Sequence, residues 1–268
     1  MLELYHNGLS TCSQKVRLVL AEKRLEFVSR DIDLLGGGQH DPAYTKLNPN
    51  HVVPTLVHDG AVLIESTLIN EYLDDAFPEV AMRPAAPAGR HAMRLWTKLL
   101  DEKVHPATAV VTFAIGPRSL LLQQPAAQRE ANIAAIPDAK ARAARRSVIE
   151  HGVQAPEFAG ALARMIDLLD RGEQALADTP WLSGESFGLA DAAVCPYVLR
   201  LDHFAMSPLL SAPARPRLAD WYQRVRSRPS FETAVAAWVP DVAAEFFRAT
   251  GEAVWPEVEA LVSSTGRG

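Results

Sequence analysis

Four side chains that carry hydroxyl or thiol groups lie together near the N-terminus. They are Ser10, Thr11, Cys12 and Ser13, and an apolar run at residues 16–21 follows them. Hydroxyl residues just before such a run predict a capped helix of about three turns. A hydroxyl at a helix start ordinarily caps the helix, but it is also placed to donate a hydrogen bond to an anion. The thiol of Cys12 is a possible nucleophile.

Two residue pairs further along the chain are also placed for chemistry. Val53-Pro54 opens an apolar, β-rich run, and Glu65-Ser66 opens a predicted helix. The hydroxyl of Ser66 and the free N–H groups of a helix start suit a carboxylate, and Glu65 suits an ammonium group. A Glu-Ser pair is also an ordinary helix start, so this pair alone does not define a site.

The elements around these residues predict an α/β fold in the first part of the chain. We expect, in order, strand, helix, strand, short helix, hairpin and helix, at residues 2–5, 10–21, 25–28, 42–47, 53–64 and 65–77. Asp59-Gly60 between two apolar runs is a strong hairpin signal. Helices mixed with strands in this order predict a sheet covered by helices.

The rest of the chain shows helical patterns and no strand pattern. A proline-rich break between residues 78 and 87 predicts a linker. Helices are expected at residues 89–113, 158–177, 189–204, 215–228 and 230–238. We therefore predict a domain at residues 1–80, a linker at 81–89, and an all-helical domain at 90–268 with an insert around 116–156.

The insert carries a basic cluster in an alanine-rich segment. Its members are Lys140, Arg142, Arg145 and Arg146. We predict a solvated helix face for them, with contact to an anionic ligand as the alternative.

Composition excludes several classes of function. The 268 residues are 48% hydrophobic and 22% charged, with a net charge of -5, which is ordinary for a globular protein and argues against a nucleic-acid partner. The two cysteines, Cys12 and Cys195, cannot form a disulfide framework, which favours a reducing compartment. We see no signal peptide and no apolar run of about 20 residues. A cytoplasmic protein with no membrane partner and no metal site is expected.

Three segments resemble the glutathione S-transferase superfamily in order and spacing. They are residues 9–18 (LSTCSQKVRL), 48–56 (NPNHVVPTL) and 65–73 (ESTLINEYL). The first is similar to the serine signature of zeta-type enzymes, and the third to the glutamate-serine helix start shared by many classes. Residues 94–98 and the insert after them resemble the bacterial β-etherase branch. Residues 188–191 resemble the capping box of the family's core helix, with Gly188 where Ser or Thr is usual.

This resemblance implies a thioredoxin-like N-terminal domain, an all-α C-terminal domain and glutathione as co-substrate. It places the Ser10 hydroxyl as the donor that stabilises the glutathione thiolate. Alignment with β-etherases makes Ser13 the alternative donor, and Cys12 is a third candidate, by comparison with omega-type enzymes that use a thiol. Neither metal nor nucleic acid is implied, and a homodimer is expected.

One hydroxyl at a helix start can supply the free energy that is needed to stabilise a thiolate. A free thiol has a pKa near 8.5, and lowering it by about two units requires roughly 2.7 kcal/mol. A charge-assisted hydrogen bond contributes about 1.5–3 kcal/mol. The helix N-terminus adds about 0.3–1 kcal/mol.

The resemblance also assigns residues to the rest of the tripeptide. Pro54 follows a cis bond in the family, and the main chain of Val53 would pair with the cysteinyl unit. Glu65 and Ser66 would hold the γ-glutamyl end. The glycyl end is expected near Gln39, His40 and His51.

Three functions follow as alternatives. The first is transfer of glutathione to a small hydrophobic electrophile, as in detoxification. The second is glutathione-dependent β-aryl-ether cleavage or Cys12-dependent thiol transfer, and the third is noncatalytic binding of glutathione.

Overall fold

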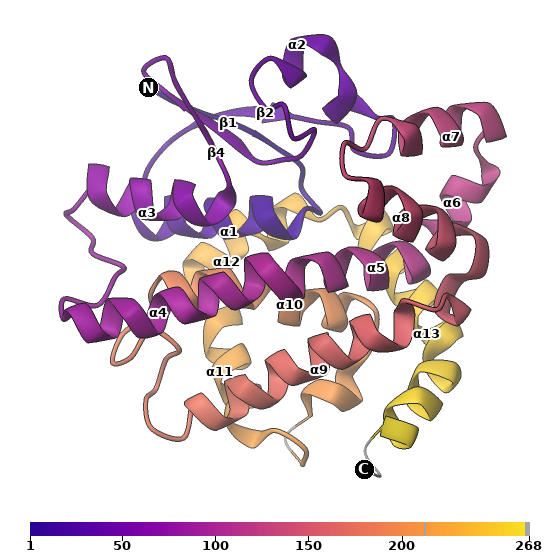
Figure 1. The fold of residues 1–268 in the computed structure, drawn as a ribbon. Helices are drawn as coiled ribbons and strands as arrows, with labels where there is room; N and C mark the ends of the chain where they lie inside the picture. The colour runs from indigo at the N-terminus through magenta and orange to yellow at the C-terminus, as the bar shows by residue number, and fades with distance from the viewer. Residues whose placement is uncertain (212, 266–268) are drawn as a thin grey trace. The chain divides into compact units, whose positions relative to one another are not determined.

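The first 76 residues form a four-stranded mixed sheet with helices (Figure 1). The structure is a computed structural model that describes residues 1–211 and 213–265. Strand β1 (Leu2–His6) pairs in parallel with β2 (Val28–Asp31) and antiparallel with β3 (Thr55–His58), which pairs antiparallel with β4 (Ala61–Ile64). The strand order is β2-β1-β3-β4. The hairpin predicted at Asp59-Gly60 is confirmed, because both residues have the positive φ that a type I′ turn requires.

Helix α1 (Thr11–Glu22) is almost completely enclosed. It packs against α3 (Ser66–Ala76) and also against α12 (Pro229–Ala234), a segment from near the other end of the chain. Every residue from Ser13 to Leu20 is buried, including the charged Lys15 and Arg17. A helix covered on more than one side needs apolar residues around most of its circumference, which explains the continuous run at 18–20.

The second strand lies three residues later than the sequence predicts. Leu25 belongs to the end of α1, where its N–H donates to Leu20 O and the N–H of Arg24 donates to Ala21 O. Arg24 has a φ of 55°. These two hydrogen bonds and this left-handed residue make a Schellman cap, in which arginine takes the place usual for glycine. The apolar Leu25 therefore closes the helix, and β2 begins at Val28.

The remainder of the described chain is helical apart from one isolated bridge between Trp181 and Gly184. The predicted α/β first part and helical second part are confirmed. After the short α2 (Pro42–Thr45) and the 3-10 turn η1 (Gly38–His40), the elements are α4 (Pro87–Leu99), η2 (Leu100–Val104), α5 (His105–Ile115), α6 (Arg118–Gln123), α7 (Ala126–Ala134), α8 (Ala139–His151), η3 (Gly152–Gln154), α9 (Phe158–Ala175), α10 (Leu189–His203), η4 (Ser207–Leu210), α11 (Pro216–Arg226), α12, η5 (Ala236–Trp238) and α13 (Asp241–Thr265).

The helices differ from the prediction at three places. The helix expected at 89–113 is two helices joined by the π-helical turn η2, because Pro106 lacks an N–H and disrupts the helical hydrogen bonds before it. The insert is helical, as α6, α7 and α8. Helix α13 was not predicted, since its sequence contains the helix breakers Gly251 and Pro256. Glycine is needed at position 251 because any side chain there would overlap the main chain of Phe204.

The prediction of a solvated basic face is wrong for Arg145. Its neighbours fit the prediction, because Lys140 is exposed and Arg146 pairs with Glu130. Arg145 is partly buried and stacks on the ring of Phe113, 3.1 Å from the ring centroid. The alanines that separate the charges allow α8 to lie close to α5, which brings Arg145 onto an aromatic ring.

The described chain divides into two compact units. The first contains Met1–Leu100, Gln174–Pro196 and Asp220–Pro240, and the second contains Asp101–Glu173, Tyr197–Ala219 and the chain from Asp241 onward. The first unit thus includes the whole sheet together with two later segments. No helix among residues 1–211 and 213–265 has the length and apolar character needed to cross a bilayer.

The start of α10 explains why Gly188 replaces the usual Ser or Thr. The cap is supplied from elsewhere: Ser183 Oγ accepts the N–H of Ala190 at 3.1 Å, and Asp191 Oδ2 accepts the N–H of Gly188 at 3.0 Å. A side chain at 188 would overlap the carbonyl oxygen of Met82 and approach Ser183 Oγ to 2.7 Å. Glycine is required because the capping hydroxyl of Ser183 occupies that space.

We predict that Gly188→Ala lowers the free energy of unfolding by about 1–3 kcal/mol, because the added methyl group overlaps main chain that cannot move freely. Chemical denaturation monitored by circular dichroism measures it. The matched control is Gly160→Ala in α9, where the added methyl group meets no atom within 4 Å. The control should raise stability by about 0.5–1 kcal/mol. Equal effects of the two substitutions would contradict the steric explanation.

Candidate active site

The register of the strands brings three connecting segments to the same end of the sheet. Tyr5 on β1 lies opposite Thr55 on β3, and Thr55 lies opposite Ile64 on β4. The loop after β1 leads to Ser10, the segment before β3 contains Val53-Pro54, and the residue after β4 is Glu65. Because β3 is antiparallel to both neighbours, these three segments all lie at the same end of the sheet.

Ser10 is the N-cap residue of α1. Its φ and ψ of -70° and 122° are those of a cap, and its Oγ accepts the N–H of Ser13 at 3.3 Å. Its side chain is partly exposed. A hydroxyl that accepts a main-chain N–H keeps its own hydrogen for donation. Ser10 can therefore cap the helix and donate to an anion at the same time.

The two competing residues differ from Ser10 in exposure and in role. Ser13 is completely buried, and its Oγ accepts the N–H of Asn7 at 3.3 Å, so it closes the loop from the inside. Cys12 is partly buried in the first turn of α1. The second thiol, Cys195, is fully buried, and burial raises its pKa well above the ordinary value.

The loop that carries Ser10 is held by Arg17. The guanidinium is buried; Nη1 donates to Asn7 O at 3.1 Å and Nη2 to Gly8 O at 2.9 Å. On its other side Nε donates to Ala234 O at 2.7 Å. The guanidinium carbon also lies 5.1 Å from the ring centroid of Trp238. Arg17 therefore joins the loop before α1 to the segment 234–238.

His6 completes this cluster as a neutral ring. Arg17 Nη1 can only donate, so Nδ1 of His6, 2.9 Å away, is the acceptor. Nε2 then carries the hydrogen and donates to Ser29 Oγ at 2.8 Å. Burial, together with the positive charge of Arg17, lowers the pKa of His6 from 6.5 to about 4. Burial likewise lowers the pKa of Arg17 to about 9.

The Val53–Pro54 peptide bond is cis, as the resemblance implies. Val53 is buried, and among the described residues neither its N–H nor its C=O has a hydrogen-bond partner. The residue before it is held firmly, because Tyr44 Oη and Asn48 Nδ2 both donate to Val52 O, at 2.6 and 2.9 Å. Burial raises the pKa of Tyr44, which keeps its hydroxyl protonated as a donor. The main chain of Val53 is thus fixed in place with unused donor and acceptor groups.

Glu65 and Ser66 form the start of α3. Glu65 is exposed and has a φ of 67°, the left-handed region that favours glycine, and its Oε1 accepts from Asn50 Nδ2 at 3.1 Å. No side chain caps the first N–H groups of α3, and Ser66 is buried beside them. Backbone strain of this kind is retained where the surroundings impose it, and it concentrates at functional sites.

The three residues predicted near the glycyl end are linked by hydrogen bonds. Gln39 Nε2 lies 3.1 Å from His40 Nε2, and His40 Nδ1 lies 3.0 Å from His51 Nδ1. With the amide as donor, His40 accepts at Nε2 and donates from Nδ1. His51 then accepts at Nδ1 and has its own N–H at Nε2. The chain of bonds therefore presents a donor at His51, whose φ is 57°.

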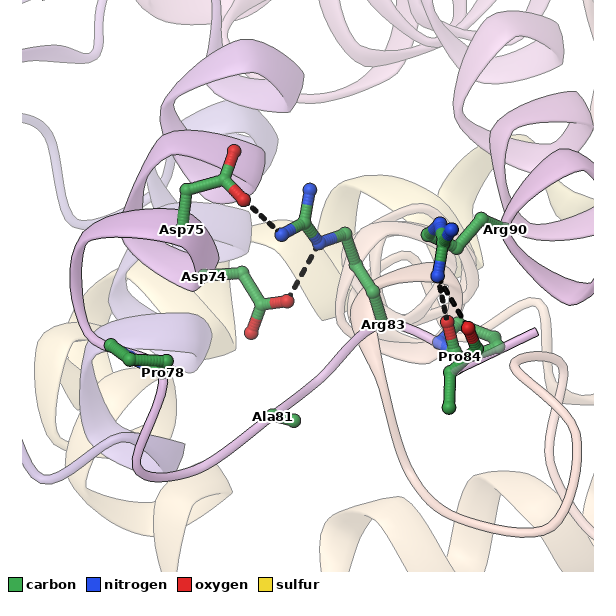
Figure 2. Close-up of a pocket in the computed structure, with 8 residues that line it drawn as sticks. Asp74, Asp75, Pro78, Ala81, Arg83, Pro84 and Arg90 are labelled. Atoms are coloured by element: carbon green, nitrogen blue, oxygen red, sulfur yellow. Dashed lines mark hydrogen bonds and ion pairs between the residues drawn. The ribbon is translucent and has the colours of Figure 1, made fainter. Parts of the chain in front are cut away.

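A pocket elsewhere in the first unit is a structural feature of the linker (Figure 2). Asp74 and Asp75 line it, and both pair with Arg83. Burial raises the pKa of Asp74, but hydrogen bonds from Lys23, the N–H of Met82 and Arg83 lower it by more. Lys23 also donates to Phe77 O and Val80 O, at 2.9 and 2.6 Å. These carboxylates are neutralised by the chain itself and fix the segment at 77–83.

Comparison with known proteins identifies the family. The glutathione S-transferase N-terminal domain profile matches residues 9–76, and the C-terminal domain profile matches residues 137–224. Protein LigF from Sphingobium sp. is 31% identical over 86% of this chain and 91% of its own length. The chain belongs to the glutathione S-transferase family. It is an enzyme of that family, whose members use glutathione as co-substrate.

Other relatives of this transferase carry different activities in their names. Glutathione S-transferase 3 of Zea mays is 29% identical, with 88% of this chain and 94% of that protein covered. A tetrachloro-p-hydroquinone reductive dehalogenase of Sphingobium chlorophenolicum is also 29% identical, with 87% and 95% covered. The crystal structure of β-etherase LigF superposes with a TM-score of 0.78 at 28% identity, over 87% of this chain and 98% of that one. The predicted fold, with its thioredoxin-like and all-α parts, is confirmed.

Some residues that hold the loops of the candidate site were given no role by the sequence analysis, although Arg17 and Asn48 lie within the quoted motifs. Arg17, Tyr44, Asn48 and Trp238 hold the loops, yet none belongs to a predicted binding set. One signal was present, because Arg17 interrupts an apolar run on a helix that is buried nearly all round. No group of three or more His, Cys, Asp or Glu side chains in the described part of the chain is placed to hold a metal ion.

We predict that His6 makes the stability of the transferase fall below neutral pH. Its folded pKa of about 4 lies below the ordinary 6.5, so the unfolded chain takes up a proton first as the pH falls. Stability is then full above pH 6.5 and is lost towards pH 4, by on the order of 2–3 kcal/mol. Denaturation at pH 7 and at about pH 4.5 measures the loss.

The variant His6→Gln should be less stable than the wild type at pH 7 but should lose less stability on acidification. His91→Gln, at an exposed position on α4, is the control and should behave like the wild type. A wild-type pH dependence in His6→Gln would contradict the assignment.

Proposed function

We propose that the protein transfers glutathione to a small hydrophobic electrophile, with Ser10 stabilising the glutathione thiolate. The observation that carries the proposal is the partly exposed Ser10 hydroxyl at the start of α1, which accepts the N–H of Ser13 and keeps its hydrogen for donation. The helix N-terminus favours negative charge at the same place. The thiolate sulfur attacks the electrophilic carbon, a C–S bond forms, and the leaving group departs with the bonding electrons.

Ser13 ranks second as the thiolate donor and Cys12 third. Burial of Ser13 and its bond to Asn7 support a role in closing the loop. Cys12 would take part in thiol transfer through a mixed disulfide with glutathione, and its partial exposure is compatible with that alternative.

The rest of the tripeptide is proposed to follow the sheet edge. The main chain of Val53 would pair with the cysteinyl unit through its unused N–H and C=O. The γ-glutamyl carboxylate would bind the uncapped start of α3 at Ser66, and its ammonium group would pair with Glu65. The linked side chains of Gln39, His40 and His51 would meet the glycyl carboxylate, with the N–H of His51 as donor.

Further proposals concern the organisation of the protein. We propose the boundaries expected from the sequence, with glutathione bound by residues 1–80 and the electrophile recognised by the helical domain at 90–268. Homodimerisation is proposed from family membership. A cytoplasmic location is proposed and agrees with two cysteines that form no disulfide, and no nucleic-acid or membrane partner is proposed.

We expect Ser10→Ala to raise the pKa of bound glutathione by about 1–2 and to reduce kcat/KM at least about tenfold, because one charge-assisted hydrogen bond is lost. The thiolate absorbance of the complex, followed against pH, reports the pKa, and 1-chloro-2,4-dinitrobenzene reports turnover. Binding of glutathione should persist. Cys12→Ser should leave the pKa unchanged.

Three outcomes would decide against the proposal. An unchanged pKa in both Ser10→Ala and the double variant with Ser13→Ala would remove both serines from the mechanism. Loss of activity confined to Cys12→Ser, with a mixed-disulfide substrate, would favour thiol transfer. Retention of glutathione without turnover of any electrophile would favour a noncatalytic binding protein.

Cleavage of β-aryl ethers is a second candidate function. Similarity to β-etherase LigF in both sequence and structure favours it. In that reaction the thiolate attacks the carbon that bears the aryloxy group, the C–O bond breaks, and a phenolate leaves. An aryl phenacyl ether incubated with enzyme and glutathione should then release one phenol per glutathione thioether formed, as measured by chromatography. Turnover of the chloronitrobenzene without any phenol release would leave the transferase proposal intact and exclude this candidate.

A further inference from the structure

Arg145 lies on the inward face of α8. Val148 and Ile149 are buried, and Arg145 precedes Ile149 by one helical turn, so the two side chains share a face. Ile149 belongs to an apolar cluster with Leu121 and Ile133, against which Phe113 packs. Arg146, the next residue, is exposed and pairs with Glu130. One arginine of this adjacent pair thus faces solvent and the other faces an apolar cluster.

The guanidinium of Arg145 is stacked on the ring of Phe113. Its central carbon lies over the ring, 3.1 Å from the ring centroid, so the two groups are in direct contact. Stacking gains cation–π attraction, but it satisfies none of the five N–H donors, which lie in the guanidinium plane. The edge of the guanidinium remains available to an acceptor.

No such acceptor is supplied by the described residues of the chain. Every other arginine of the insert has one. Their partners are Ile149 O and Glu150 O for Arg118, Leu121 O and Gln124 O for Arg129, Ile136 O and Pro137 O for Arg142, and Glu130 for Arg146. Burial lowers the pKa of Arg145 from 12.5 to about 9, and no neighbouring carboxylate offsets that effect. A bound anion would stabilise the charged form.

We propose that Arg145 is the recognition residue of an anion site in the second unit and that the site takes a small organic carboxylate. The edge of a guanidinium presents two parallel N–H groups at the spacing of the two carboxylate oxygens. The ring of Phe113 fixes the plane of the fork, and the apolar cluster around it suits a ligand with an aromatic or aliphatic body. The site does not depend on glutathione, so it stands or falls apart from the proposed transferase activity.

Benzoate and benzamide are the probes, because they have the same shape and differ in charge. Isothermal titration without glutathione should show that wild-type protein binds benzoate at least about tenfold more tightly than benzamide. Arg145→Gln should abolish that preference and weaken benzoate at least about tenfold. The matched control is Arg146→Gln, which removes the same charge one residue away and should change benzoate affinity less than about twofold.

Arg145→Lys covers the case in which the glutamine variant does not fold, since it keeps the charge but loses the bidentate fork. It should weaken benzoate severalfold while leaving benzamide unchanged. In nuclear magnetic resonance spectra, benzoate should shift the Nε–H signal that disappears in Arg145→Lys. Equal binding of benzoate and benzamide by the wild type, or equal losses in the Arg145 and Arg146 variants, would overturn the proposal.

Discussion

The candidate site depends on one buried guanidinium. Arg17 donates to the carbonyl oxygens of Asn7 and Gly8 and to that of Ala234, and it donates to the ring of His6. A buried cation of this kind is tolerated only when its donors are satisfied. Satisfying them fixes the path of the loop that leads to Ser10. The same contacts therefore stabilise the buried charge of Arg17 and position Ser10, the candidate thiolate donor.

The pairing of the strands provides the second constraint. Tyr5, Thr55 and Ile64 lie side by side across β1, β3 and β4, so the segments next to them lie at the same end of the sheet. A slip of one residue in either pairing would turn buried side chains outward, and for that reason the apolar pattern holds the register firmly. Packing in the sheet therefore fixes the positions of Val53 and Glu65, without contacts between the two residues.

Sequence reasoning was strongest where local chemistry decides the structure. The cap at Ser10, the turn at Asp59-Gly60 and the helix start at Ser66 all follow from residue types within a few positions. It was weakest where distant residues decide. Nothing local indicates that Trp238 covers His6, that Ser183 caps the helix after Gly188, or that Arg145 stacks on Phe113. The roles of Ser10, Val53 and Glu65 in binding glutathione stay predictions.

The close approach of Gly8 to the carbonyl of Trp238 has a consequence for the order of events during synthesis. The loop before α1 leaves the ribosome well before the acceptor at Ala234 and the indole that covers Arg17 are made. Until then, a charged group that belongs inside the protein has only part of its partners. The nascent N-terminal segment can form its sheet early, since those contacts are local. The loop before α1 can settle only when Ala234 is available, 217 residues after Arg17. The loop thus settles only after residues 234–238 are made, and a polypeptide released before them would carry the motif without the geometry.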